Sequence, residues 1–169
     1  MVALGVTSKL FHAELVSFGE AFVGRFGGLG VAFGFFYPDM IPVPGVHEAF
    51  SAFGLLGGMP FWEVVAWAFA GSITGGTIGF FLGRSLRTTE RLSRFLQEGR
   101  GRYVHGLVQR YGTWALALVA VSPIPYSIGC WSCGALDYPL WKFLAVSLLR
   151  IPRIAFYLWL IQMGFLVAT

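Results

Sequence analysis

The sequence predicts an all-α integral membrane protein, built as an inverted-topology repeat with two opposed re-entrant hairpins. Three observations lead to this prediction: an apolar composition, an uncharged stretch long enough to cross a bilayer, and a motif that occurs twice. Hydrophobic residues make up 56% of the 169 residues and charged residues only 12%. Soluble domains carry roughly 25% charged residues, so this chain cannot cover a globule with polar surface. We therefore expect residues 1–169 to form a single membrane domain.

The first half of the chain contains two predicted transmembrane helices separated by a hairpin. Residues 16–38 are apolar and glycine-rich, although Glu20 and Arg25 interrupt them, and they form the first predicted helix. Residues 41–60 are apolar but bracketed by prolines, which favours a re-entrant hairpin. Residues 62–83 form the clearest transmembrane helix, because they contain enough consecutive uncharged residues for a hydrocarbon core of about 30 Å.

A basic segment, residues 84–110, lies between the two halves of the chain. Four arginines fall on one helical stripe, with leucines on the opposite side, which predicts an amphipathic helix on a membrane surface. These arginines are Arg84, Arg87, Arg91 and Arg94. The positive-inside rule places this segment in the cytoplasm. Its expected partner is an anionic lipid surface. Nucleic acid is not an expected partner, because membrane segments flank the basic run.

The second half of the chain contains a broken apolar stretch and a last predicted transmembrane helix. Residues 112–137 are apolar but interrupted by Pro123 and Pro125, so one long span competes with a second re-entrant hairpin. Residues 140–167 form the last predicted helix, which carries arginines near its middle. The chain would then hold about three transmembrane helices, two hairpins and one amphipathic cytoplasmic helix.

An internal repeat decides in favour of the hairpins. Each copy reads Pro-x-Pro, a short apolar run, a glycine, and then Pro-x-Trp with a charged residue where a helix begins. The first copy runs from Pro42 to Glu63 and the second from Pro123 to Lys142. Because the basic segment separates the copies, the two hairpins would enter the membrane from opposite faces, an arrangement common in transporters. The predicted hairpin turns contain Pro42, Pro44, Pro123, Pro125, Tyr126 and Ser127.

Two arginines in the last predicted helix are the main candidates for binding a substrate. A charge at the bilayer centre costs about 2.5–3.5 kcal/mol, so Arg150 and Arg153 must face protein or a wet cavity. A guanidinium group binds phosphate in a two-pronged geometry, which favours a headgroup site. The alternative is a structural ion pair with Glu63, Glu48 or Glu20.

Two further groups of residues have candidate roles. His47, Glu48 and Glu63 are candidates for proton coupling or for a counter-ion, although a solvated position at the interface is the alternative. A glycine at every fourth position of the helix over residues 62–83 predicts close packing against another helix. These glycines are Gly71, Gly75, Gly79 and Gly83.

Cys130 and Cys133 form a Cys-x-x-Cys motif in the second hairpin. A structural zinc site needs four ligands, and thioredoxin-type chemistry needs a βαβ context that this chain lacks. We therefore expect two small buried side chains, and neither a metal nor a cofactor.

Four stretches of the sequence resemble the DedA family, also called the SNARE-associated Golgi or VTT-domain superfamily. They are PVPG (42–45), GSITGGTIGFFLGR (71–84), RYGTWALALVAVSPIPYSIGCWSCGALDYPLWKF (110–143) and RIPRIAFY (150–157). The Pro-Ile-Pro-Tyr and Arg-x-x-Arg elements resemble its YqaA-like branch most, although Ser127 stands where that branch tends to carry lysine. The resemblance covers about residues 38–165. It implies two opposed re-entrant hairpins and movement of lipids between leaflets, and bacterial members are linked to undecaprenyl phosphate recycling and the proton-motive force.

The predicted function is that of a lipid translocase or scramblase-like transporter, and not of an enzyme. It would move a phosphate-bearing lipid, either undecaprenyl phosphate or a phospholipid, and a protonatable Glu48 could couple the step to protons. The alternatives are a transporter of small ions or cationic compounds, and a membrane-embedded thiol oxidoreductase that uses Cys130 and Cys133. The expected location is the cell (inner or plasma) membrane, with multiple passes. A homodimer is a further expected partner, since so few spans make a thin barrier.

Overall fold

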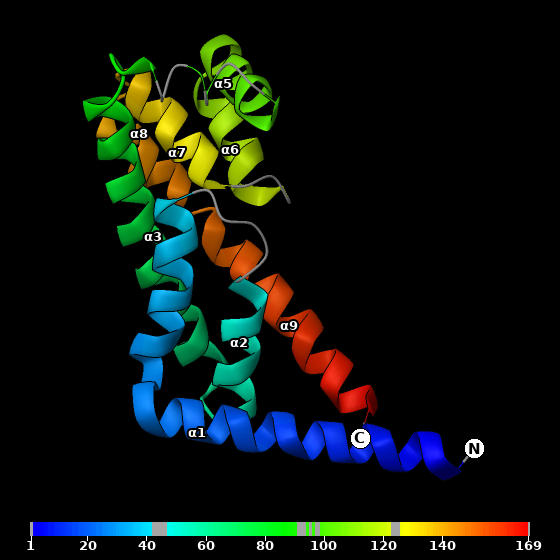
Figure 1. The fold of residues 1–169 in the computed structure, drawn as a ribbon. Coiled ribbons are helices and arrows are strands. Elements are labelled where there is room, and N and C mark those ends of the chain that lie inside the picture. Colours follow the sequence, from blue (N-terminus) through cyan, green and yellow to red (C-terminus); the bar gives the residue numbers. More distant parts are fainter. Residues whose placement is uncertain are drawn as a thin grey trace.

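The structure, a computed structural model, is all-helical over the residues that it describes. These residues are 2–41, 47–90, 94, 96, 99–122 and 126–168; side chains are not described at 2–13, 15, 47–48, 99–100 and 165–168. The helices are α1 (Val2–Met40), α2 (His47–Leu56), α3 (Phe61–Ser85), α5 (Gly99–Tyr111), α6 (Thr113–Val121), α7 (Tyr126–Ala135), α8 (Leu140–Ser147) and α9 (Arg150–Ala168) (Figure 1).

Two helical stretches among the described residues are long and apolar enough to cross a membrane. One is Phe61–Ser85, which is α3, and the other is Leu140–Gly164, which α8 and α9 form together. Each contains 25 residues, and a helix of that length extends about 37 Å. The predicted helix over residues 62–83 lies inside α3.

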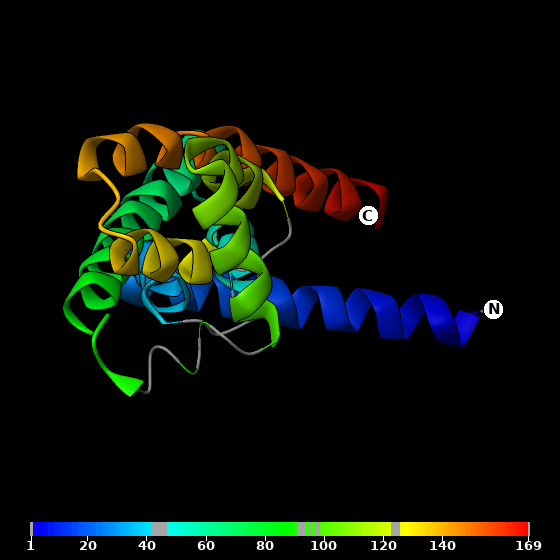
Figure 2. The same cartoon turned by 90° about the horizontal axis from the view of Figure 1, so that it is seen from above.

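Helix α1 bends at Gly27, inside the range 16–38 predicted as the first transmembrane helix. Gly27 has φ 54° and ψ −146°, a conformation that glycine adopts readily because it has no Cβ. Before the bend, α1 runs across the end of the bundle, and after it α1 rises beside α3 (Figure 1). There, Cβ atoms on Gly71 and Gly75 would lie 1.9 and 2.2 Å from carbonyl oxygens of α1, so only glycine permits this approach. Seen from above, the start of α1 and the end of α9 project from the same side of the bundle (Figure 2).

The two copies of the sequence motif have matching backbones. Gly27 and Gly112 both have φ 54°, and each precedes the helix that leads into a Pro-x-Pro segment. The helices that follow these segments, α2 and α7, each contain ten residues. Both then end in a turn with a positive φ, 81° at Gly58 and 53° at Asp137. The structural repeat therefore begins earlier in each copy than the sequence motif does.

Two short helices occupy the region predicted to be either one span or a hairpin, residues 112–137. Helices α6 and α7 contain nine and ten residues, and each would extend about 15 Å, half the thickness of a hydrocarbon core. In the first copy, α1 and α2 pack in antiparallel fashion, because Gly34 lies against Phe50 and Val31 against Gly54. The prolines of both turns lie in 42–46 and 123–125, outside the described residues.

Two hydrophobic cores hold the helices together, and each includes side chains from the other copy. The first core contains Val31 and Val64, and it also takes Ile154 and Leu158 from α9. The second core contains residues of α5 to α8, and it also takes Phe80 from α3. Each long helix therefore completes the core of the opposite copy, which fixes the two halves to each other.

The predicted amphipathic helix through Arg84 to Arg94 is interrupted. Helix α3 ends at Ser85, and a turn follows in which the amide and the hydroxyl of Thr89 both donate to the Leu86 carbonyl. These local bonds satisfy the carbonyl of Leu86, the residue that follows the last turn of α3. The basic segment continues as α5, which ends next to Gly112.

The last predicted helix, residues 140–167, is also interrupted, at residues 148–149 between α8 and α9. Pro152 explains the break, because it has no amide hydrogen to donate to the Leu148 carbonyl. The Ile151 amide bonds to that carbonyl instead, at 3.0 Å. The break places Arg150 at the first position of α9.

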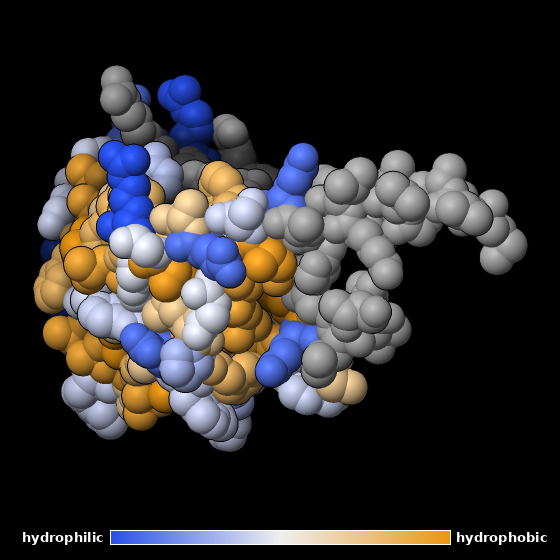
Figure 3. Space-filling view, turned by 90° about the horizontal axis from the view of Figure 1, so that it is seen from below, coloured by the Kyte–Doolittle hydropathy of each residue, from blue (hydrophilic) through white to orange (hydrophobic). Residues whose placement is uncertain are grey.

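Large apolar side chains also lie on the outside of the bundle. Trp114 is 83% exposed and Trp159 is 49% exposed, and several phenylalanine and leucine side chains are exposed as well. Figure 3 shows one such face, where apolar side chains cover much of the surface between separate polar ones. Such a surface is typical of a protein in contact with lipid.

Candidate functional site

A buried ion pair joins the start of α9 to the end of α1. Two guanidinium nitrogens of Arg150 each lie 3.0 Å from a different carboxylate oxygen of Asp39. The two side chains are 4% and 1% exposed, so each charge depends on the other for its stability in an apolar environment. From the sequence, Glu20, Glu48 or Glu63 is the expected partner of a structural ion pair, whereas the structure pairs Arg150 with Asp39. Glu20 and Glu63 are exposed instead.

Tyr126 of α7 contacts the same arginine. The centre of the Arg150 guanidinium group lies 4.1 Å from the centroid of the Tyr126 ring, a cation–π geometry. The hydroxyl group of Tyr126 is hydrogen-bonded to Ser147. Tyr126, predicted as a hairpin-turn residue, therefore takes part in the polar network around Arg150.

Arg153, one turn after Arg150, is half-buried and bridges to another helix. One of its nitrogens donates to the Ala120 carbonyl at the end of α6, at 3.3 Å. Its guanidinium centre lies 5.7 Å from the ring centroid of Tyr157 on its own helix. Arg153 is more accessible than Arg150 and could change its contacts at a lower cost.

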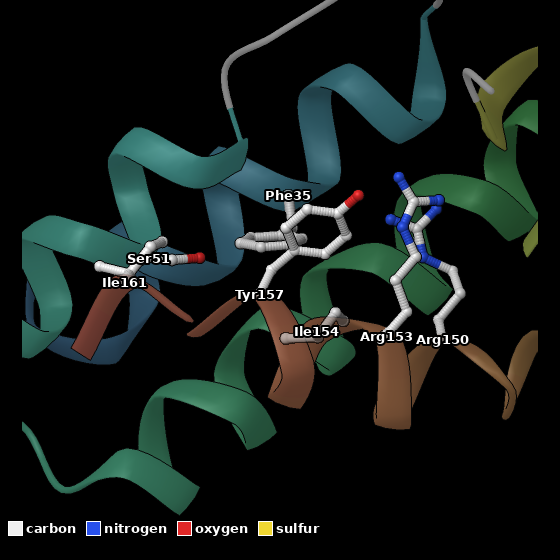
Figure 4. A pocket seen from close by; sticks show the side chains of 7 residues that line it. All are labelled: Phe35, Ser51, Arg150, Arg153, Ile154, Tyr157 and Ile161. Carbon is white, nitrogen blue, oxygen red and sulfur yellow. The ribbon is translucent and has the colours of Figure 1, made fainter. Parts of the chain in front are cut away.

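A pocket with a polar end and an apolar end lies where α1, α2 and α9 meet. Its free space is about 370 Å³, open mouth included, and it is lined by Phe35, Ser51, Arg150, Arg153, Ile154, Tyr157 and Ile161. Figure 4 shows that Arg150 and Arg153 extend side by side at one end, whereas Ile161 and Ser51 lie at the other. The Arg153 guanidinium group and the Asp39-paired Arg150, beside apolar walls, suit an anion attached to a hydrocarbon chain.

The other residues with predicted roles do not line this pocket within the described part of the chain. Ser127 is buried in α7, at 2% exposure, and Glu63 lies exposed in the first turn of α3. The hairpin prolines and the side chains of His47 and Glu48 lie outside the described residues. Their predicted roles therefore remain predictions.

Of the predicted glycines, Gly71 and Gly75 face α1, whereas Gly79 and Gly83 line the contact between α3 and α7. Gly79 and Gly83 lie against Trp131 of α7. Cys130 and Cys133 are both free thiols with no exposed surface. A Cβ on Gly76 would lie 3.3 Å from the sulfur of Cys130, so the thiol occupies space that this glycine leaves open.

Asp39 and Ser51 are site residues that the sequence interpretation missed. Asp39 had a usable signal, because it is a carboxylate directly after an apolar helix and next to a proline, and charges in such positions need a partner. Ser51 had none, since a serine in an apolar helix is common.

Comparison with protein-family models identifies one family. The family model of the VTT domain matches residues 41–163. An uncharacterized protein of Methanocaldococcus jannaschii is 28% identical over 123 residues, which are 71% of this chain and 74% of the relative. No solved structure matches the chain significantly. The matched region contains both pocket arginines and begins two residues after Asp39.

Proposed function

Because the chain belongs to the VTT-domain family, we propose that it is a multi-pass protein of the cell membrane that moves a phosphate-bearing lipid between leaflets. It would do so as a transporter, without catalysing a covalent reaction. The observation that carries this proposal is the pocket between α1, α2 and α9. Its arginines suit a phosphate, and its apolar walls suit the first carbons of a lipid chain.

The proposed position in the membrane follows from the two long helical stretches. Trp62 and Trp141 are 69% and 68% exposed at the starts of α3 and α8, and tryptophan favours the membrane interface. Arg84 and Arg87 mark the opposite, cytoplasmic end of α3. The pairs α1–α2 and α6–α7 would then enter from opposite faces as re-entrant hairpins. Backbone of this kind is tolerated at membrane depth where it borders protein or a wet cavity.

The other proposed partners are an anionic lipid surface, protons and a second copy of the chain. Arg102 and Arg110 are exposed on α5 and would face the anionic headgroups of the cytoplasmic leaflet. Glu48 and His47, at the start of α2, are the proposed groups for proton coupling. A homodimer would shield the thin barrier around the pocket.

The test is lipid movement in liposomes that contain the purified protein and an acyl-labelled fluorescent phosphatidylglycerol. Dithionite quenches label in the outer leaflet, so the rate of further quenching reports movement from the inner leaflet. We expect the protein to accelerate quenching, and Arg153→Gln to slow it about tenfold, since a charge-assisted hydrogen bond is lost. A pH gradient across the liposomes tests proton coupling.

Arg25→Gln is the matched control, because it removes an exposed arginine from α1 that does not line the pocket. Its rate should equal that of the unmodified protein. If the unmodified protein does not accelerate quenching for phosphatidylglycerol or for a labelled polyprenyl phosphate, the proposed function is wrong.

A further inference from the structure

Tyr126 is held at both its hydroxyl group and its ring. Ser147 donates its hydroxyl hydrogen to the Phe143 carbonyl, at 2.8 Å. Because Ser147 has only one such hydrogen, the Tyr126 hydroxyl must be the donor in the bond between these two residues. The face of the same ring lies against the guanidinium group of Arg150. Tyr126 thus connects Ser147 to Arg150, which lies three residues further along the chain.

The ring of Tyr126 has little room to move. Tyr126 is 3% exposed, and it stacks against Phe143 with ring centroids 6.3 Å apart. On the α3 side, a Cβ on Gly76 would lie 2.9 Å from the Tyr126 ring, so glycine at this position makes the space that the ring fills. The position of the ring is therefore set by three helices together.

These contacts restrict the orientation of Arg150. Asp39 binds the two terminal guanidinium nitrogens, and Tyr126 covers one face of the group. The Nε atom of Arg150 is buried and makes no hydrogen bond with any described residue. A buried N–H without a partner is costly, which favours a ligand or a water at this position.

We propose that Tyr126 and Ser147 are positioning residues for Arg150: they hold its guanidinium group in the orientation that an anion in the pocket requires. This inference rests on the proposed function and deepens it, because it assigns Arg150 a fixed role at the base of the pocket. The more accessible Arg153 would then adjust to the bound phosphate. Loss of the Tyr126–Ser147 hydrogen bond should weaken binding without slowing the step that follows it.

The test measures binding and transport separately on the full-length protein. In detergent, binding of soluble dihexanoyl phosphatidylglycerol is measured as the rise in the midpoint of thermal unfolding that the lipid causes. Tyr126→Phe and Ser147→Ala should each raise its Kd about three- to tenfold, as expected for one buried hydrogen bond. The double variant should bind no more weakly than either single variant, because both changes remove the same bond. In liposomes, the rate at saturating labelled lipid should stay unchanged.

Tyr138→Phe is the matched control, because it removes a tyrosine hydroxyl that bonds to Thr113, away from the pocket. It should lower thermal stability and leave the Kd unchanged. The proposal is overturned if Tyr138→Phe weakens binding equally, if the effects of Tyr126→Phe and Ser147→Ala are additive, if neither changes the Kd, or if the unmodified protein does not bind the probe. If Tyr126→Phe does not fold, the comparison of the Kd values of Ser147→Ala and Tyr138→Phe still tests the proposal. Binding without lipid movement would contradict the proposed function and leave the positioning role supported by the Kd values.

Discussion

The contact between α3 and α7 is closed, whereas the equivalent contact between α9 and α2 holds a pocket. On α7, Trp131 precedes Gly134 by three residues, and on α2, Ser51 precedes Gly54 by three. Trp131 lies against the glycines of α3 and donates from its ring nitrogen to the Met40 carbonyl, at 2.8 Å. Ser51 is too small to fill the corresponding space and lines the pocket instead.

The two long helices that make these contacts, α3 and α9, also differ in the size of the side chains that they present. Helix α3 presents glycines to α7, so the two backbones touch, whereas α9 presents arginine, tyrosine and isoleucine side chains toward α2. A repeated backbone can therefore give a closely packed contact in one copy and a pocket in the other through the size of a few side chains. The four predictions below test this difference, from the largest expected effect to the smallest.

The ion pair at the pocket should contribute most to stability. Asp39→Asn leaves the Arg150 charge buried without a counter-charge, and removal of one partner of a buried pair costs about 3–5 kcal/mol. Thermal and chemical unfolding of the purified protein would measure this loss. Asp137→Asn is the control, because Asp137 pairs with Arg84 and Arg87 at the surface; it should cost less than about 1 kcal/mol. Equal losses would mean that burial does not distinguish the two pairs.

The closed contact should not tolerate one added carbon. A Cβ on Gly134 would lie 1.9 Å from the Phe80 carbonyl oxygen, so Gly134→Ala forces α3 and α7 apart at a cost of about 1–3 kcal/mol. The midpoint of thermal unfolding reports the effect. Gly106→Ala, on α5, meets no atom within 4 Å and should leave the midpoint unchanged or raise it. A stable Gly134→Ala protein would show that this contact is looser than the structure indicates.

The pocket should close when Ser51 is replaced by tryptophan, the residue at the equivalent position of α7. Ser51→Trp fills the space between α2 and α9, and we expect lipid movement to fall about tenfold while the protein remains folded. The dithionite assay measures the rate, and Ser51→Ala, which removes only the hydroxyl group, should stay within about twofold. A Ser51→Trp protein with full activity would exclude this pocket from the transport route.

The smallest expected effect is a pH dependence of stability that comes from His105 in the second copy. Burial lowers the pKa of His105 on α5 below its ordinary value of 6.5. The folded protein therefore favours neutral His105, whereas His105 in the unfolded chain takes up a proton below pH 6.5. Protonation favours the unfolded chain, so the free energy of unfolding decreases as the pH falls below 6.5. Unfolding between pH 7.5 and 5 should show a decline that His105→Gln reduces. An identical decline in both proteins would assign it to other groups.

Local sequence rules predicted the parts of the fold that depend on neighbouring residues. Proline and tryptophan at Pro60–Trp62 and Pro139–Trp141 marked the starts of α3 and α8, because each acts within a turn of its own position. The bend at Gly27 could not be located, since several glycines nearby could have taken the same conformation. The partner of Arg150 was also missed, because Asp39 precedes it by 111 residues and no local rule connects them.

The exchange of side chains between the two cores has a consequence for biosynthesis. The first copy leaves the ribosome without Ile154 and Leu158, which complete its core. These residues are made about 90 residues after Val64, a delay of about 5 to 20 seconds at ordinary translation rates. Until then, the nascent first half must wait in an incomplete state in which a chaperone or the insertion machinery could hold it. Fragments of the chain should therefore accumulate only when both halves are produced in the same cell.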